Sequence, residues 1–324
     1  MLDRRGFLAA LGASALAAAA GGCAAVPAVP RLRIMVPNPP GGGFDITART
    51  VSATLKETRL APDVEVFNLS GGAGAAGLAR LLYEEGNGAL LMQMGLGVVA
   101  TTHIADGVAP VTRATPLARL LEEPIVVLVV PDSPYRSFGE LLAAWRDPRT
   151  RLRMGGGSAA GGPDHLALML IAEELGIDLG AADYVWHDGG GETLAALLSH
   201  SVDVGAAGVG EYRHAIAAGE LRPLAVTGPQ RIAGVDAPTL REIGIDVDFV
   251  NWRGLLAPPE ISADARDSLV TVLGELRATP QWQDALRENH WTDAFLTGSD
   301  FGDFLSAENR RVSSLVDRLA PPES

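Results

Sequence analysis

Residues 36–49 read VPNPPGGGFDITAR, in which three consecutive glycines separate a short apolar run from the start of a helical pattern. Glycine tolerates positive φ angles and lets the backbone come close to a ligand. A glycine-rich turn that opens a helix also brings free N–H groups and the positive end of the helix dipole together. This stretch therefore predicts a strand, a tight turn and a helix, with a turn suited to holding an anion.

The same order of strand, glycine-rich turn and helix recurs along the chain. Apolar runs typical of strands lie at 31–37, 63–70, 89–95 and 124–131, and the five glycine-rich turns lie at 41–43, 71–77, 155–162, 189–191 and 208–210. Strands that alternate with helices predict parallel α/β sheets. Ligands of such sheets bind outside the carboxyl ends of the strands. The turns together predict one cleft lined with backbone donors, and the segments 261–291 and 299–320 predict helices on the outside.

Length and charge narrow the class of protein. The 324 residues are enough for about two domains. Hydrophobic residues make up 47% and charged residues 20%, as in ordinary globular proteins. The formal net charge is −13, which argues against a nucleic-acid surface and against a polybasic membrane patch. The sign of the charge says little about a small ligand, because a buried pocket sets its own local field.

The N-terminus has the pattern of an export signal. Arg4 and Arg5 precede GFL and an apolar, small-residue run at 9–20, which is too short to span a bilayer comfortably. The twin arginines resemble a twin-arginine signal. AGGC, which ends at Cys23, resembles a lipoprotein cleavage motif, although Ala20 stands where leucine is preferred. We expect a signal at 1–22, a lipid on Cys23 and a linker at 23–30. A soluble export signal with a chance cysteine is the alternative.

Motifs of enzymes fit poorly. GAGAAG at 72–77 matches the dinucleotide fingerprint, but the acidic residue expected about 20 positions later is missing. A phosphate-binding P-loop is excluded because it needs a Gly-Lys pair, and the sole lysine, Lys56, follows a leucine. GGSAA at 156–160 lacks the last glycine of a serine-hydrolase elbow. The six histidines form no pair with metal-ligand spacing. We therefore expect no enzyme, no cofactor and no metal site.

A family resemblance rests on several blocks in order. They are VPNPPGGGFDITAR, NLSGGAGAAGLARL, MGGGSAAGGPDHLAL, YVWHDGGGETLAALLSHSVDVG and NWRGLLAPP. From about Arg31 to Leu319 the chain resembles the Bug/TctC family, the extracytoplasmic solute receptors of tripartite tricarboxylate transporters. The resemblance implies an α/β, two-lobed type II periplasmic binding fold (Venus flytrap) with a ligand cleft. Lobe 1 would take 31–131 plus 253–324 and lobe 2 would take 132–252, with crossovers near 130–133 and 251–254.

The resemblance also implies a ligand and a site. A small di- or tricarboxylate would be held between the lobes through backbone amides and water, and then delivered to a membrane permease. The candidate ligand-binding residues are Gly42, Gly43, Phe44, Asp45, Gly71, Gly72 and Ala73 in lobe 1, Gly157, Ser158, Gly162, His165, Gly190, Gly191, Glu192 and Gly208 in lobe 2, and Arg253.

For two of these candidates, Asp45 and Arg253, the sequence suggests a more specific role. Asp45 fits a helix N-cap with an i,i+4 ion pair to Arg49 better than a contact to an anion. Arg253 is the candidate for a distal carboxylate or a hinge contact. Two other functions stay open: a sensory lipoprotein that presents a carboxylate to a signalling partner, and a cofactor enzyme on a Rossmann-like sheet.

Overall fold

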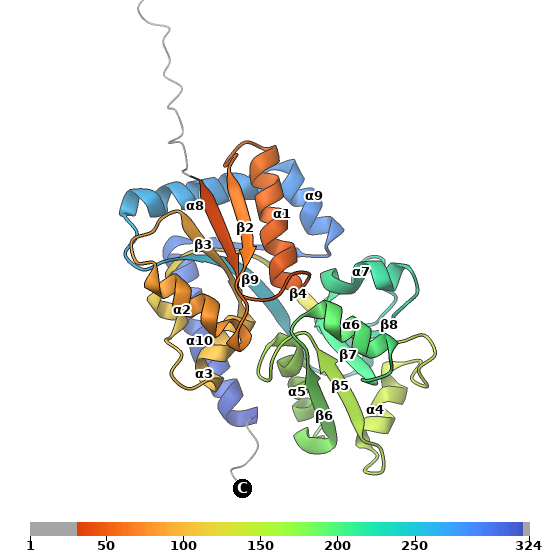
Figure 1. The fold of residues 1–324 in the computed structure, drawn as a ribbon. Helices are drawn as coiled ribbons and strands as arrows, with labels where there is room; N and C mark the ends of the chain where they lie inside the picture. Colours follow the sequence, from red (N-terminus) through yellow and green to blue (C-terminus); the bar gives the residue numbers. More distant parts are fainter. Residues whose placement is uncertain (1–30, 320–324) are drawn as a thin grey trace, which may run out of the picture.

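The computed structural model describes residues 31–319, which form two groups of strands and helices with a long strand shared between them (Figure 1). The expected export signal and Cys23 lie outside the described residues. The first group contains β1 (Leu32–Val36), α1 (Gly43–Glu57), β2 (Val64–Asn68), α2 (Ala75–Tyr83), β3 (Leu90–Gly95), α3 (Leu96–Ile104), β9 (Val250–Ala257), α8 (Ala263–Ala278), α9 (Pro280–Glu288), β10 (Thr292–Thr297) and α10 (Gly298–Leu319).

The second group follows the shared strand β4 (Thr115–Val129). It contains α4 (Phe138–Arg146), β5 (Leu152–Gly156), α5 (Pro163–Glu174), β6 (Ala182–Trp186), α6 (Gly190–Leu198), β7 (Val204–Gly208), α7 (Val209–Ala217) and β8 (Arg222–Val226). The path through the strands is β2-β1-β3-β9-β4-β7-β5-β6, with β10 and β8 also paired to β4. This is the mixed α/β, two-lobed fold that the sequence predicts, with the antiparallel β4, β9 and β10 added to the parallel strands.

The partners of β4 change in the middle of the strand. Thr115 through Pro124 pair antiparallel with β9, whereas β4 from Ile125 onward pairs with β7 and β8. On the returning side, the Phe249 N–H still donates to the Thr227 carbonyl, directly before β9 begins. Both changes of partner therefore come earlier in the chain than the crossovers expected at 130–133 and 251–254. The run at 124–131 is uniformly apolar, so its sequence pattern does not show where β4 changes its pairing partner.

The first lobe is built as the sequence pattern dictates. On β1, Ile34 and Val36 are fully buried, and on α1 Val51 and Leu55, one helical turn apart, are fully buried as well. Side chains at i and i+2 of a strand and at i and i+4 of a helix share a face. The helix therefore packs its apolar face on the sheet, and this contact fixes where the glycine turn at its start lies.

The C-terminal part differs from the expected set of helices by one strand. β10 pairs antiparallel with the first half of β4, with a register shift between Asp293 and Leu296. Its polar positions and this irregularity hide the alternation that marks a strand. α10 then returns to the first lobe, where Asn309 Oδ1 lies 2.9 Å from Nε2 of His103 on α3. None of the helices in residues 31–319 has both the length and the apolar character needed to cross a membrane.

Candidate ligand-binding cleft

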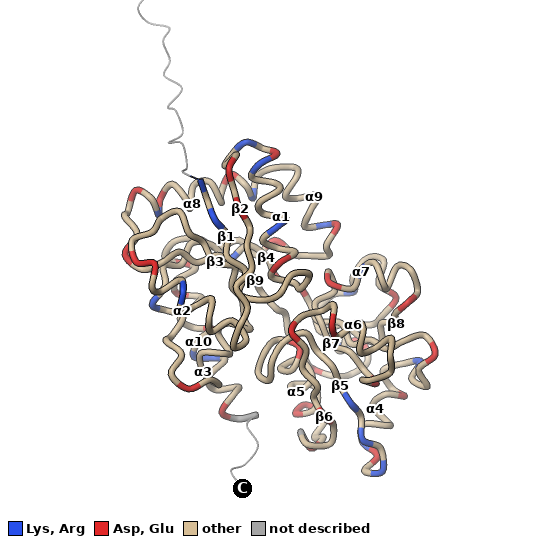
Figure 2. The backbone as a smooth tube through the Cα atoms, viewed as in Figure 1, with Lys and Arg blue, Asp and Glu red and all other residues tan. Residues whose placement is uncertain are grey.

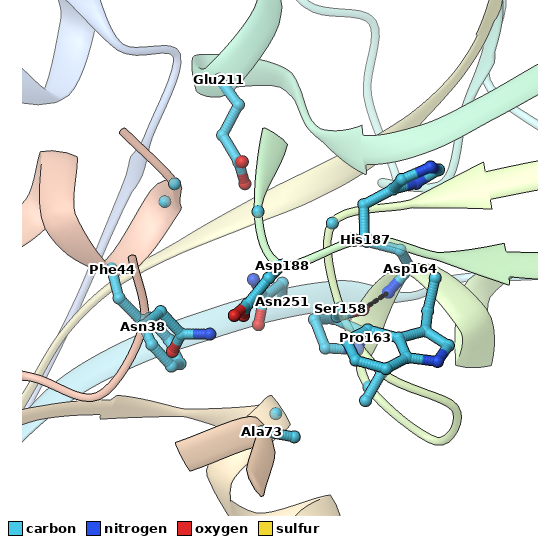
Figure 3. Close-up of a pocket in the computed structure, with 18 of the residues that line it drawn as sticks. Asn38, Phe44, Ala73, Ser158, Pro163, Asp164, His187, Asp188, Glu211 and Asn251 are labelled. Carbon is cyan, nitrogen blue, oxygen red and sulfur yellow. Dashed lines mark hydrogen bonds between the residues drawn. The ribbon is translucent and has the colours of Figure 1, made fainter. Parts of the chain in front are cut away.

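A cleft lies where the two lobes meet, and turns at the carboxyl ends of strands form much of its wall (Figure 3). It encloses about 750 Å³ of space, part of it open to solvent. The first lobe contributes the starts of α1 and α3, and the second contributes the turns that precede α5 and α6. The backbone N–H groups at helix starts have no partner within the helix, so they are available to a ligand or to another side chain.

The structure brings part of the predicted set of site residues to this cleft. The predicted residues that line it are Gly42, Gly43, Phe44, Ala73, Gly157, Ser158, Gly162 and Arg253. The predicted residues outside the cleft wall are Asp45, Gly71, Gly72, His165, Gly190, Gly191, Glu192 and Gly208. Most residues of the second set lie one or two positions along the chain from a residue of the wall, and several of them fix the wall through hydrogen bonds or close backbone contacts.

Asp45 holds the turn before α1. The buried carboxylate accepts hydrogen bonds from the Gly41 N–H at 3.0 Å, Arg49 Nε at 2.8 Å and Asn68 Nδ2 at 3.0 Å. Burial by itself would raise the pKa of Asp45, but these hydrogen bonds lower it below its ordinary value. The predicted ion pair with Arg49 is confirmed. The predicted N-cap role is wrong in position, because Gly42 is the N-cap and Asp45 reaches back from the first turn.

His165 and Glu192 have matching roles in the second lobe. His165 Nδ1 accepts the Gly161 N–H at 2.9 Å, and its ring centroid lies 4.4 Å from that of Tyr184. Burial lowers the pKa of His165 to about 4, so the ring is a neutral acceptor near pH 7. Glu192 accepts the Asp188 N–H at 3.1 Å, which closes the turn before α6. Both side chains fix loops of the cleft without lining it.

Several cleft residues were missed by the sequence analysis. They are Asn38, Gly97, Thr101, Pro163, Asp164, Trp186, His187, Asp188, Glu211 and Asn251; Ala159, Ala160 and Gly189 lie in predicted turns but were not among the named candidates. Most of them could have been found from their place in the sequence, because they lie at or just after the end of a strand or at the start of the next helix. MGLGVV at 94–99 was a sixth strand-to-helix turn, but its unbroken apolar character concealed it. Asp164 and Glu211 stand in the first turns of α5 and α7, where acidic residues are common, and they were not among the candidates.

A buried cluster of charges lies at the base of the cleft. Arg253 on β9 is 2% exposed, and its Nη2 donates to Oε1 of Glu123 on β4, which is fully buried. The other oxygen of Glu123 accepts Trp291 Nε1 at 3.0 Å. The guanidinium also donates to Thr47 Oγ1 at 3.3 Å. Arg253, the candidate partner of a distal ligand carboxylate, thus has a carboxylate of the protein itself as its first partner.

Glu211 from the second lobe reaches the same cluster. Its Oε1 lies 3.5 Å from Arg253 Nη2, and the carboxylate accepts the Gly43 N–H at the start of α1. A Cβ at Gly43 would lie 2.8 Å from Glu211 Oε1, and one at Gly190 would lie 2.5 Å from Oε2. The Glu211 carboxylate therefore lies between the N-termini of α1 and α6, in a position where a helix start attracts an anion.

Asp164, Asp188 and Glu211 of the cleft wall all have raised pKa values, and the shifts of Glu211 and Asp164 are the large ones. Burial raises the pKa of Glu211 to about 8; Arg253 opposes this shift and Asp164 adds to it. Burial also raises the pKa of Asp164 to about 7, against hydrogen bonds from Ser158 and the Gly157 N–H. The physical cause is the same for both, since low-polarity surroundings disfavour a charged carboxylate. Arg253 is the positive side chain of the described cleft wall, and its guanidinium is already paired with the carboxylate of Glu123.

The fold and the cleft together define a two-lobed solute-binding protein of the type II periplasmic class. Within residues 31–319, no group of three or more His, Cys, Asp and Glu side chains is arranged to hold a metal ion. Over residues 48–320 the sequence matches the family described as "Tripartite tricarboxylate transporter family receptor" (TctC). The chain belongs to this family of solute-binding receptors, as the sequence blocks predict.

Relatives with curated names are similar over most of their length. A UPF0065 protein of Pseudomonas sp. (strain P51) is 26% identical over 87% of this chain and 84% of its own. A UPF0065 protein of Agrobacterium vitis is 27% identical over 74% of this chain and 69% of its own. BugT of Bordetella pertussis is 26% identical over 70% of each chain.

Solved structures share the fold. R. palustris Rpa4515 with adipate has a TM-score of 0.81 and 24% identity, and the match covers 89% of this chain and 97% of that one. MatC from Rhodopseudomonas palustris with bound malate has a TM-score of 0.74 and 21% identity, covering 88% and 98%. The periplasmic binding protein BugD has a TM-score of 0.80 and 20% identity, covering 89% and 97%.

Proposed function

We propose that this chain is an exported receptor that captures a small organic carboxylate between its lobes and delivers it to the permease of a tripartite tricarboxylate transporter. The observation that carries the proposal is the meeting of glycine-rich turns and helix starts from both lobes around one cleft. Such turns offer backbone donors to an anion. Membership of the receptor family supports the link to a permease. Two structural neighbours hold the dicarboxylates malate and adipate, which supports the ligand class.

The proposed boundaries of the lobes follow the pairing of β4 and β9. One lobe takes residues 31–124 and 250–319, and the other takes 125–249. A ligand that contacts both lobes favours the closed form, because it gains its full set of contacts only when the lobes are shut. The two chain crossings near 124 and 250 would then act as the hinge.

Anchoring to the membrane by a lipid on Cys23 is part of the proposal. The twin arginines, the apolar run and AGGC support it, and the receptor family fits a location outside the cytoplasm. The net charge of −13 and the scatter of Lys and Arg among acidic residues in both lobes (Figure 2) support a small-molecule partner over a nucleic acid.

The ligand class is tested by differential scanning fluorimetry of the purified chain with succinate, malate, citrate, adipate, a neutral sugar and a diamine. The proposal expects a rise in melting temperature with one or more of the acids. A shift with the sugar or the diamine, together with no shift from any acid, would contradict it.

A further inference from the structure

The charges of the cleft are unbalanced for a ligand that carries only negative groups. The side chains of the described cleft wall include three carboxyl groups, those of Asp164, Asp188 and Glu211, against the guanidinium of Arg253. That guanidinium donates to the fully buried Glu123 as well. A buried charge without a counter-charge is costly. A dicarboxylate would place further negative charge beside these carboxyl groups, two of which hold a proton part of the time near pH 7.

Protein carboxylates also occupy two of the anion positions that the cleft offers. The Gly43 N–H at the start of α1 donates to Glu211, and the Gly157 N–H donates to Asp164. These donors belong to turns that the sequence predicts as ligand contacts. The structure therefore fills part of the anion cradle with side chains of the second lobe.

Unpaired acceptors point to the missing chemical group. Asn251 is 4% exposed and lines the cleft, and its Oδ1 accepts no hydrogen bond from residues 31–319. Oδ1 of Asn38, on the turn after β1 of the same lobe, is buried and unpaired in the same way. Figure 3 shows Asp188, Glu211 and Asn251 directed into the space between the lobes. A buried acceptor without a donor costs free energy, which a donor on a ligand would remove.

We propose that the ligand is an amino-carboxylate, whose ammonium group is received by Asp188, Glu211 and Asn251 and whose carboxylate binds the remaining backbone donors of the glycine-rich turns. This proposal rests on the proposed carboxylate function and narrows its substrate class. The ammonium supplies the positive charge that the wall lacks and the N–H donors that Asn251 and the carboxylates can accept.

The raised pKa values of Glu211 and Asp164 allow a further test of the proposal, because they determine whether protons are released or taken up when the ligand binds. A carboxyl group with a pKa of about 7 or 8 holds a proton part of the time near pH 7. An ammonium group nearby favours the ionised carboxylate, so its binding releases protons. A second ligand carboxylate in the same place disfavours ionisation, so its binding takes protons up.

The test compares ligands that differ only in the amino group. Calorimetric titrations of the purified chain at pH 7.5 use succinate against aspartate, glutarate against glutamate, and adipate against 2-aminoadipate. Each titration is repeated in two buffers of different ionisation enthalpy to count protons. We expect the amino member of at least one pair to bind tenfold or more tightly, with proton release.

Each other outcome has a definite meaning. Equal or tighter binding of the plain dicarboxylates overturns the amino-carboxylate proposal and leaves the carboxylate receptor standing. Binding of simple amines without a carboxyl group, and of no acid, overturns both. Failure of every acid in the three pairs and in the wider panel overturns both as well.

Variants separate the ammonium contacts from general effects. Asp188→Asn and Glu211→Gln should each reduce the preference for the amino member at least fivefold while they change the affinity for the plain member less. Glu220→Gln, an exposed position just after α7, is the matched control and should keep the preference. Asp188 is half-buried on a loop, so its variant serves where Glu211→Gln fails to fold. An unchanged preference in both variants would overturn the assignment.

Discussion

Arg253 of β9 and Glu123 of β4 form a buried ion pair beside the point where β4 changes partners from one lobe to the other. Their side chains are 2% and 0% exposed, and Glu211 of the second lobe lies 3.5 Å from the same guanidinium. Burial raises the pKa of Glu123 above its ordinary value, and Arg253 opposes this shift. The cluster thus links both strands of the proposed hinge to the wall of the cleft.

Removal of the Glu123 charge should destabilise the fold. Glu123→Gln leaves the Arg253 guanidinium without its main counter-charge, which costs about 3–5 kcal/mol in buried pairs. Urea denaturation followed by circular dichroism measures the free energy of unfolding. Glu65→Gln is the control, because its pairs with Arg31 and Arg33 are exposed to solvent and contribute at most about 1 kcal/mol. Equal losses in the two variants would show that the buried pair has no special weight.

A side chain at Gly43 should weaken ligand binding. A Cβ there would lie 2.8 Å from Oε1 of Glu211 on the second lobe, so the lobes could not approach as closely, and it would also press on the Arg253 guanidinium of its own lobe. We expect Gly43→Ala to weaken ligand binding at least tenfold in calorimetry. Gly191→Ala is the matched control, since a Cβ at Gly191 meets no atom within 4 Å and its φ is not positive. An unchanged affinity in Gly43→Ala would contradict closure around this turn.

Stability should fall as the pH rises from 7 to 9. The pKa of Glu211 is about 8 in the folded chain, well above the ordinary value of 4.5, so the folded state binds a proton that the unfolded state has lost. Arg253, Asp164 and Glu123 face this carboxyl group, and Asp164 adds to the effect in the lower part of the range because its pKa is about 7. His165 opposes this fall slightly near pH 7, because its pKa is about 4 in the folded chain against the ordinary 6.5, so the unfolded state still binds part of a proton there.

The expected slope is at most about 1.4 kcal/mol per pH unit for each proton held only by the folded state. Chemical denaturation at several pH values measures it. Glu211→Gln should flatten the slope, whereas Glu220→Gln should leave it unchanged. A stability that is constant or rises between pH 7 and 9 would contradict the buried, proton-binding state of Glu211.

The lipid anchor makes a separate prediction about location. Cys23→Ser should move the exported protein from the membrane fraction to the soluble extracytoplasmic fraction, because the thiol is the proposed attachment point of the lipid. Replacement of Arg4 and Arg5 by lysines should instead keep the precursor inside the cell if export uses the twin-arginine route. Cell fractionation with immunoblotting separates the two results. A Cys23→Ser protein that stays in the membrane fraction would contradict a lipid anchor on Cys23.

The strand-to-helix units of the fold could be predicted because each has a local signal. β1 and α1 follow from the alternation of Ile34 and Val36 and from the one-turn spacing of Val51 and Leu55. The change of partners after Pro124 has no local signal, because the choice between β9 and β7 depends on strands more than 70 residues away in sequence. Long-range pairing of that kind is set by packing and topology and leaves no mark on periodicity.

The cleft was predicted as a set of turns together with Arg253, and its three carboxyl groups were not predicted. The glycines at 42, 43 and 157 were marked by their place after strands, and they line the cleft. Glu211 and Asp164 stand in the first turns of α7 and α5, where an acidic residue is ordinarily a favourable partner of the helix dipole. Only the meeting of the two lobes places Glu211 against Arg253 and Gly43.

Calorimetric titration of the purified chain with small carboxylates tests the central claim most directly. The account predicts one-site binding of at least one carboxylate from the succinate, malate, citrate, adipate and amino-carboxylate set. At 100 times the dissociation constant, that ligand should add about 2.7 kcal/mol to the free energy of unfolding. Binding of neutral sugars or simple amines with no response to any carboxylate would contradict the account.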